Sequence, residues 1–244
     1  MSDAPTKKSR FKVILFALLT SVICSVLITA SAIGLKDRQQ TNMELDRKVN
    51  ILKAANLVGE KKPGGEKINE LYDTHIKEVM VDSQGKIIEA AAGDYLHFYF
   101  IRENNTPDAR VNGYILPINT RGLWGKIYGY LAFSNDGQTV SGFSVFSHSE
   151  TPGLGGEIES DWFRRNFEGK RILNAEDRFV SVGIAKGKVE NLPEDLQEHY
   201  VDGISGATLT GKYLTEGIRQ TLERYDAVSI TFRQKQLKPQ KTDQ

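Results

Sequence analysis

The stretch YVDGISGATLTGKYL, residues 200–214, places a threonine just after a glycine-bounded turn, where a helix is predicted to begin. A helix N-terminus presents unpaired N–H groups and a partial positive charge, which favour a phosphate. The hydroxyl of Thr208 can hydrogen-bond a phosphate or be esterified by one, and Lys212 would add a positive charge one turn later. From these residues alone the alternative is structural, with Ser205 or Thr208 capping the helix.

A second stretch, HSETPGLGGEI at 148–158, has the composition of a tight loop. Pro152 and Gly153 suit the two central positions of a type II turn. Gly155 and Gly156 would let backbone N–H groups approach a planar ring and hydrogen-bond its carbonyl edge. The alternative is an ordinary surface loop.

Other chemistries find less support. The four histidines lack His or Cys partners at ligand spacing, so no metal site is predicted, and His148 is expected to be structural. No serine lies in a Gly-x-Ser-x-Gly elbow, and no catalytic residue is predicted. In GLWGKIYGYLAF (122–133), Trp124 is a candidate to stack on a ring, although such aromatic strands more often belong to a core.

An apolar run without charges, residues 13–35, is long enough to cross a ~30 Å hydrocarbon core as a helix. Four basic residues precede it within segment 1–12, so the positive-inside rule predicts a cytoplasmic N-terminus and an exported remainder. The alternative is a cleaved signal peptide, because residues 30–32 read Ala-Ser-Ala, but the run exceeds the usual signal core. The only cysteine, Cys24, lies in the run, which leaves the exported part without disulfides.

The 244 residues and the net charge of +1 fit one anchor plus one domain and argue against a nucleic-acid-binding protein. A helical stalk and linker are predicted at 36–67, an exported domain at 68–232 and a flexible tail at 233–244. Within the domain, strands outnumber helices and do not alternate with them, so the predicted class is α+β. Strands are expected at 95–101, 111–118 and 179–185, hairpins at 76–90 and 123–147, and helices at 160–169 and after Gly206.

The segment DGISGAT (202–208) matches the covalent flavinylation signature Asp-x-x-(Ser/Thr)-Gly-Ala-Thr and so resembles the FMN-binding domain family. In that family a separate exported flavin transferase joins the phosphate of FMN to the last threonine. The resemblance implies Thr208 as the acceptor and Asp202 as the acidic position of the signature. The implied cofactor-binding set also includes Ser205, Gly206, Ala207 and Lys212, together with Glu150, Thr151, Gly153, Leu154 and Gly155 of the second stretch.

Segment 148–158 is similar to a loop shared by the C-type subunits of the Na+-translocating NADH:quinone reductases and the G-type subunits of the related Rnf complexes. Segments 122–133, 11–40 and 44–57 are similar to the quinone-reductase family specifically. The resemblance implies a single-pass protein of the bacterial inner membrane with a periplasmic FMN domain. It would relay electrons from NADH toward a membrane quinone (ubiquinone), coupled to sodium export, with subunits A, B, D, E and F as partners. A G-type member of an Rnf complex and a non-redox envelope scaffold are the alternatives.

Overall fold

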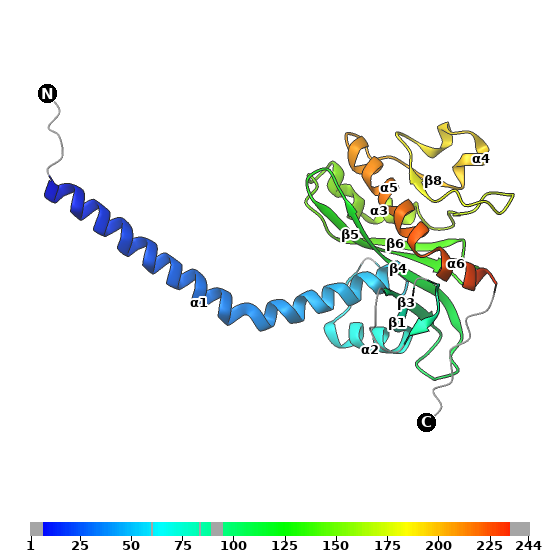
Figure 1. The fold of residues 1–244 in the computed structure, drawn as a ribbon, viewed down its shortest axis with the longest axis horizontal. Coiled ribbons are helices and arrows are strands. Elements are labelled where there is room, and N and C mark those ends of the chain that lie inside the picture. Colours follow the sequence, from blue (N-terminus) through cyan, green and yellow to red (C-terminus); the bar gives the residue numbers. More distant parts are fainter. Residues whose placement is uncertain (1–6, 60, 83, 89–94, 235–244) are drawn as a thin grey trace. The chain divides into compact units, whose positions relative to one another are not determined.

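The computed structural model describes residues 7–59, 61–82, 84–88 and 95–234. It divides into two compact units, Met1–Glu44 and Leu45–Gln244. Unit 1 consists of the greater part of helix α1 (Lys7–Ala54), whose residues from 11 to 44 are all exposed (Figure 1). By length and composition α1 can cross a membrane, in agreement with an N-terminal anchor. The helix predicted after the anchor is continuous with it.

Unit 2 is built on a six-stranded antiparallel sheet in the order β2-β1-β3-β4-β5-β6. Both predicted hairpins are present, β1–β2 and β5–β6, although the end of the first, from residue 89, lies outside the described residues. A short parallel pair, β7 and β8, forms a second sheet. The strands are β1 Ile76–Val81, β2 Ile87–Ile88, β3 Leu96–Arg102, β4 Val111–Arg121, β5 Lys126–Ser134, β6 Val140–Ser147, β7 Gly183–Ile184 and β8 Tyr200–Val201.

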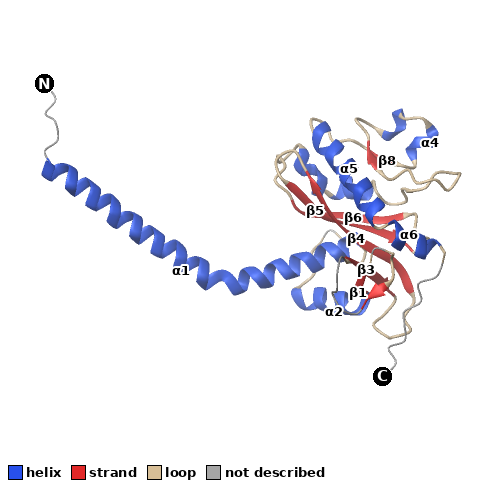
Figure 2. Cartoon of the chain, viewed as in Figure 1, coloured by secondary structure: helices blue, strands red, loops and turns tan. Residues whose placement is uncertain are grey.

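Helices cover both faces of the large sheet (Figure 2). Side chains alternate between the faces along each strand, so β4 sends Leu116 and Ile118 to one core and Ile115 to the other. The first core packs against α5 and α6, and the second against α2 and the last turns of α1. The remaining helices are α2 Gly65–His75, η1 Gly155–Glu159, α3 Asp161–Arg165, η2 Val189–Asn191, α4 Glu194–Gln197, α5 Thr208–Arg224 and α6 Asp226–Arg233. The predicted α+β class is confirmed.

Helix α5 crosses β4 at very short range. The helix predicted after Gly206 is present, and its apolar stripe of Leu214, Ile218 and Leu222 is buried in the first core. A Cβ added to Gly217 would lie 1.9 Å from Thr120 Oγ1, so only glycine permits this approach of helix and strand. The sheet therefore fixes the position of α5, and with it the N-terminus of α5.

The compact unit begins earlier in the chain than the predicted domain of 68–232. Ile51, Leu52 and Ala54 are fully buried in the second core, because the end of the predicted helical stalk packs on the sheet. The predicted linker also contains the start of α2 at Gly65. At the other end, α6 extends to Arg233, and residues 235–244 of the predicted tail lie outside the described residues.

Candidate functional site

Thr208 is the first residue of the 17-residue helix α5, and it is exposed. The first helical hydrogen bond runs from the Gly211 N–H to the Ala207 carbonyl, at 3.0 Å. The amides of residues 208–210 therefore have no acceptor within the helix. Ala207 occupies the N-cap position and, among the described residues, no side chain caps the helix. The structural alternative, in which Ser205 or Thr208 is the cap, is therefore wrong.

The turn before α5 depends on glycine. Gly206 has a φ of +73°, and the Ala207 N–H donates to the Ile204 carbonyl at 3.1 Å to close the turn. A Cβ on Gly206 would lie 2.8 Å from Leu154 Cδ2. The turn at 202–208 and the loop at 148–158 thus lie side by side, as expected for parts of one site.

Asp202 connects the turn to the segment 187–189. Its carboxylate accepts hydrogen bonds from Lys188 Nζ and from the Val189 N–H, each at 2.7 Å. Burial alone would raise the pKa of Asp202, but these donors hold its pKa below the ordinary value. The Gly203 N–H donates to the Gly187 carbonyl at 2.8 Å. In this geometry Asp202 positions the turn, since its carboxylate is engaged by the 187–189 segment.

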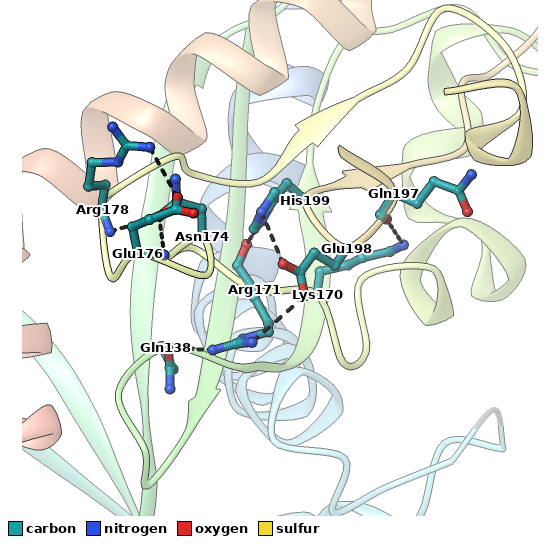
Figure 3. A network of polar contacts seen from close by, with 9 residues as sticks. All are labelled: Gln138, Lys170, Arg171, Asn174, Glu176, Arg178, Gln197, Glu198 and His199. Carbon is teal, nitrogen blue, oxygen red and sulfur yellow. Dashed lines mark hydrogen bonds and ion pairs between the residues drawn. The ribbon is translucent and has the colours of Figure 1, made fainter. Parts of the chain in front are cut away.

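A polar network anchors β8, the strand that leads into this turn (Figure 3). The buried His199 hydrogen-bonds the Arg171 carbonyl through Nδ1 at 2.7 Å, and Lys170 Nζ donates to the Gln197 carbonyl at 2.7 Å. Burial lowers the pKa of Lys170. Sequence reasoning considered His199 only as a metal ligand, and no periodicity connects residues 170–171 with 197–199.

Glu150 joins three segments that are distant in the sequence. This residue is only 5% exposed. One carboxylate oxygen accepts the hydroxyl of Thr210 at 2.5 Å, and the other accepts the backbone N–H of Trp124 at 3.0 Å. Its own N–H donates to His148 Nδ1 at 3.0 Å. The carboxylate therefore ties the β4–β5 turn and the start of α5 to the 148–158 loop, a contact that sequence reasoning missed.

The loop itself has the predicted turn. Gly153 has a φ of +72°, and the Leu154 N–H donates to the Thr151 carbonyl at 3.1 Å, as in a type II turn with Pro152 and Gly153 at its centre. The next glycines differ from expectation. Both are buried, and the Gly156 N–H is taken by the Thr151 carbonyl at 2.9 Å. A Cβ on Gly155 would lie 2.6 Å from Thr210 Oγ1, so this glycine makes room for the Glu150–Thr210 hydrogen bond.

Large apolar side chains on the joined segments are exposed to solvent. Trp124 is 69% exposed, Leu209 50% and Leu154 43%. Lys212 is also exposed, one turn after Thr208 and on the same side of α5. An exposed threonine, helix amides without an acceptor in the helix, a cation and exposed apolar groups therefore occur together, a combination suited to a ligand with a phosphate and a planar ring.

Comparison with known proteins supports this description. The FMN-binding domain family matches residues 122–223. The C subunit of the Na(+)-translocating NADH-quinone reductase of Vibrio alginolyticus is 32% identical over 230 residues, covering 83% of this chain and 85% of the relative. The corresponding protein of Pseudomonas aeruginosa is 32% identical over 235 residues, covering 84% and 88%.

Solved structures agree. The crystal structure of the C subunit from Parabacteroides distasonis is 26% identical with a TM-score of 0.65, over 80% of this chain and 96% of that one. The Shewanella oneidensis NqrC structure, 21% identical with a TM-score of 0.59 over 81% and 98%, shares the fold. The resemblance seen in the sequence is confirmed, and the chain belongs to the NqrC family, the C subunits of the Na+-translocating NADH-quinone reductases.

Proposed function

We propose that this protein carries FMN covalently, through a phosphoester to Thr208, and relays electrons within the reductase. The observation that carries the proposal is the exposed hydroxyl of Thr208 at the uncapped N-terminus of α5. A phosphoester there would keep one negative charge beside the helix amides, which stabilise anions. Lys212 would add a second favourable charge at the same side of the helix.

The surrounding residues fit the rest of the group. Gly206 lets the side chain of Leu154 approach the turn, and Leu154 and Trp124 offer exposed apolar surface for a planar ring. Bound FMN supplies reversible electron transfer, while the chain positions the ring and tunes its surroundings. Glu150 acts indirectly, since its carboxylate holds the segments that bear these two side chains. Thr151, Gly153 and Gly155 shape the loop that carries Leu154.

The topology follows from the N-terminus. The basic residues of segment 1–12 favour a cytoplasmic N-terminus, α1 anchors the chain in the inner membrane, and the FMN domain is periplasmic. A separate exported flavin transferase would act on Thr208. Electrons from NADH would pass through this protein toward a quinone, with subunits A, B, D, E and F as partners and sodium export as the coupled process. A covalent tether suits a carrier outside the cytoplasm, where a lost cofactor is not replaced.

The test uses Thr208→Ala in the full-length chain, expressed with the maturation machinery. The denatured protein band is expected to lose its flavin fluorescence under ultraviolet light, because no hydroxyl remains to esterify. Thr210→Ser is the matched control, since it keeps the buried hydroxyl that binds Glu150. Peptide mass spectrometry locates the modification. FMN on Thr210 with Thr208 unmodified would refute the assignment.

A further inference from the structure

The outer edge of β4 has backbone groups outside the β4–β5 ladder near its C-terminal end. One of them, the Arg121 carbonyl, accepts a long hydrogen bond from the Thr120 hydroxyl at 3.5 Å. The β4–β5 hairpin is closed by a hydrogen bond from the Gly122 N–H to the Gly125 carbonyl, at 2.6 Å. In an antiparallel pair the backbone groups of alternate residues point to opposite sides. Thr120 therefore bonds toward β5, and the N–H and C=O groups of Asn119 and Arg121 point away from it. Between Ile115 and the hairpin turn, no described strand pairs with that side of β4.

A specific feature ends the pairing of β3 with β4. Continuing the register from Tyr99 opposite Ile115 would place His97 opposite Pro117. Proline has no N–H to donate, and the His97 carbonyl instead accepts the hydroxyl of Tyr225 at 2.7 Å. The side chain of Tyr225 thus replaces the missing ladder bond and leaves the rest of the β4 edge open.

A groove runs along this edge. One cavity of about 770 Å³ is lined by the hairpin residues 119–126 and by Tyr213, Glu216 and Gln220 of α5. A second, of about 400 Å³, lies between Tyr95 and Tyr225 and shares Asn119 with the first. An added strand lies about 4.8 Å from its neighbour, and it would direct alternate side chains toward the two faces of the sheet.

The charges along the groove are unbalanced. Arg121 and Lys126 lie directly opposite each other on β4 and β5, and both are exposed. Like charges in this arrangement are destabilising. Arg121 lies over the ring of Tyr213, 5.0 Å from its centroid, and no carboxylate among the described residues forms an ion pair with either cation. Glu216 accepts a hydrogen bond from Gln220 at 2.8 Å.

We propose that an extended segment of another subunit of the reductase adds as a strand to the β4 edge, pairing with Asn119 and Arg121. Such a segment would carry an acidic side chain that neutralises the Arg121–Lys126 pair. Trp124 lies at the end of the same groove, so this docking would bring the partner beside the exposed face of the site. The inference goes beyond the proposed function, because strand addition does not depend on the covalent flavin.

The first test separates the backbone from the side chain at one position. Asn119→Pro removes the outward N–H and leaves the bonds of Ile118 and Thr120 to β5, whereas Asn119→Ala keeps the N–H. Affinity-tagged full-length variants are expressed with the other subunits and purified from membranes. We expect Asn119→Pro to recover at least tenfold less of the partner subunits and Asn119→Ala to match the wild type. Equal recovery by both variants, or equal loss, would overturn the proposal.

The second test needs no substitution that endangers folding. Amide hydrogen exchange is measured at Asn119 and Arg121 in the isolated chain and in the assembled complex. Both amides are expected to exchange at least tenfold more slowly in the complex, while the Thr120 amide, already in the β4–β5 ladder, changes little. Unchanged exchange would refute strand addition. Slowing that appears in the isolated chain with rising concentration would mean that a second copy occupies the edge, which would also refute it.

The third test addresses charge. The double variant Arg121→Glu/Lys126→Glu is expected to lose partner subunits at least tenfold, and Lys186→Glu, an exposed lysine outside the groove, is the control. In-gel flavin fluorescence is recorded for every variant. Normal fluorescence with lost assembly supports the edge as a separate docking surface. Full assembly of the double variant would contradict the prediction that the added segment carries an acidic side chain.

Discussion

The buried hydrogen bond between Thr210 and Glu150 allows a quantitative prediction. Thr210→Val keeps the shape of the side chain and removes its hydroxyl. The carboxylate of Glu150, which accepts one hydrogen bond from Thr210 and one from the Trp124 N–H, then loses the first of them. A hydrogen bond to a charged group contributes about 1.5–3 kcal/mol, and Glu150 is too buried for water to replace the donor freely. Thr210 is itself 1% exposed, so the full loss is expected.

Thermal unfolding of the full-length chain in detergent measures the effect. Unit 2 spans Leu45–Gln244, a size at which 1 kcal/mol shifts Tm by about 2–4 °C. Thr210→Val is therefore expected to lower Tm by roughly 3–12 °C, whereas Thr210→Ser, which keeps the hydroxyl, shifts it less. The flavin should stay attached in both. A Tm for Thr210→Val within about 1 °C of wild type, or an equal loss in both variants, would refute the role assigned to Glu150.

Three further outcomes are expected. Asp202, whose folded pKa is depressed beside Lys188, stabilises the fold above its unfolded pKa of about 4, and this contribution is lost as pH falls through the lower folded pKa. Asp202→Asn should therefore flatten the decline of Tm between about pH 5 and pH 2, and an unchanged slope would contradict this. Gly217→Ala should destabilise by roughly 1–3 kcal/mol in denaturant unfolding through its clash with Thr120, while Gly187→Ala, which meets no atom within 4 Å, should be near neutral. A reporter that works only after export, fused to the C-terminus, should be active, and activity of a cytoplasmic-only reporter there would reverse the proposed topology.

Local patterns were enough to predict much of this molecule. The hairpins, the helix after Gly206 and the Pro152–Gly153 turn were all predicted from neighbouring residues, and each is present. The turn before Thr208 was also predictable, because a glycine at positive φ followed by the start of a helix forms a pattern of neighbouring residues. The fold class followed from the order of these elements.

Contacts between distant segments were not predictable in the same way. The family resemblance placed Glu150 in the cofactor-binding set, but nothing in the sequence states that Thr210 lies against its carboxylate, 60 positions away. Gly155 was predicted to let a ring approach the backbone, and the sequence did not show that its missing side chain also makes room for that buried pair. A helical stalk was predicted within 36–67, but not the sheet that buries its side chains Ile51, Leu52 and Ala54.

The burial of the last turns of α1 limits how unit 2 can be isolated. Ile51, Leu52 and Ala54 fill the second core, and the hydroxyl of Ser144 on β6 donates to the Asn50 carbonyl at 2.7 Å. A protease or a gene truncation that removed everything before residue 68 would remove Val49, Ile51, Leu52 and Ala54 from the second core and leave only α2 to cover that face of the sheet. A water-soluble fragment therefore has to retain the end of the anchor helix, starting no later than Leu45.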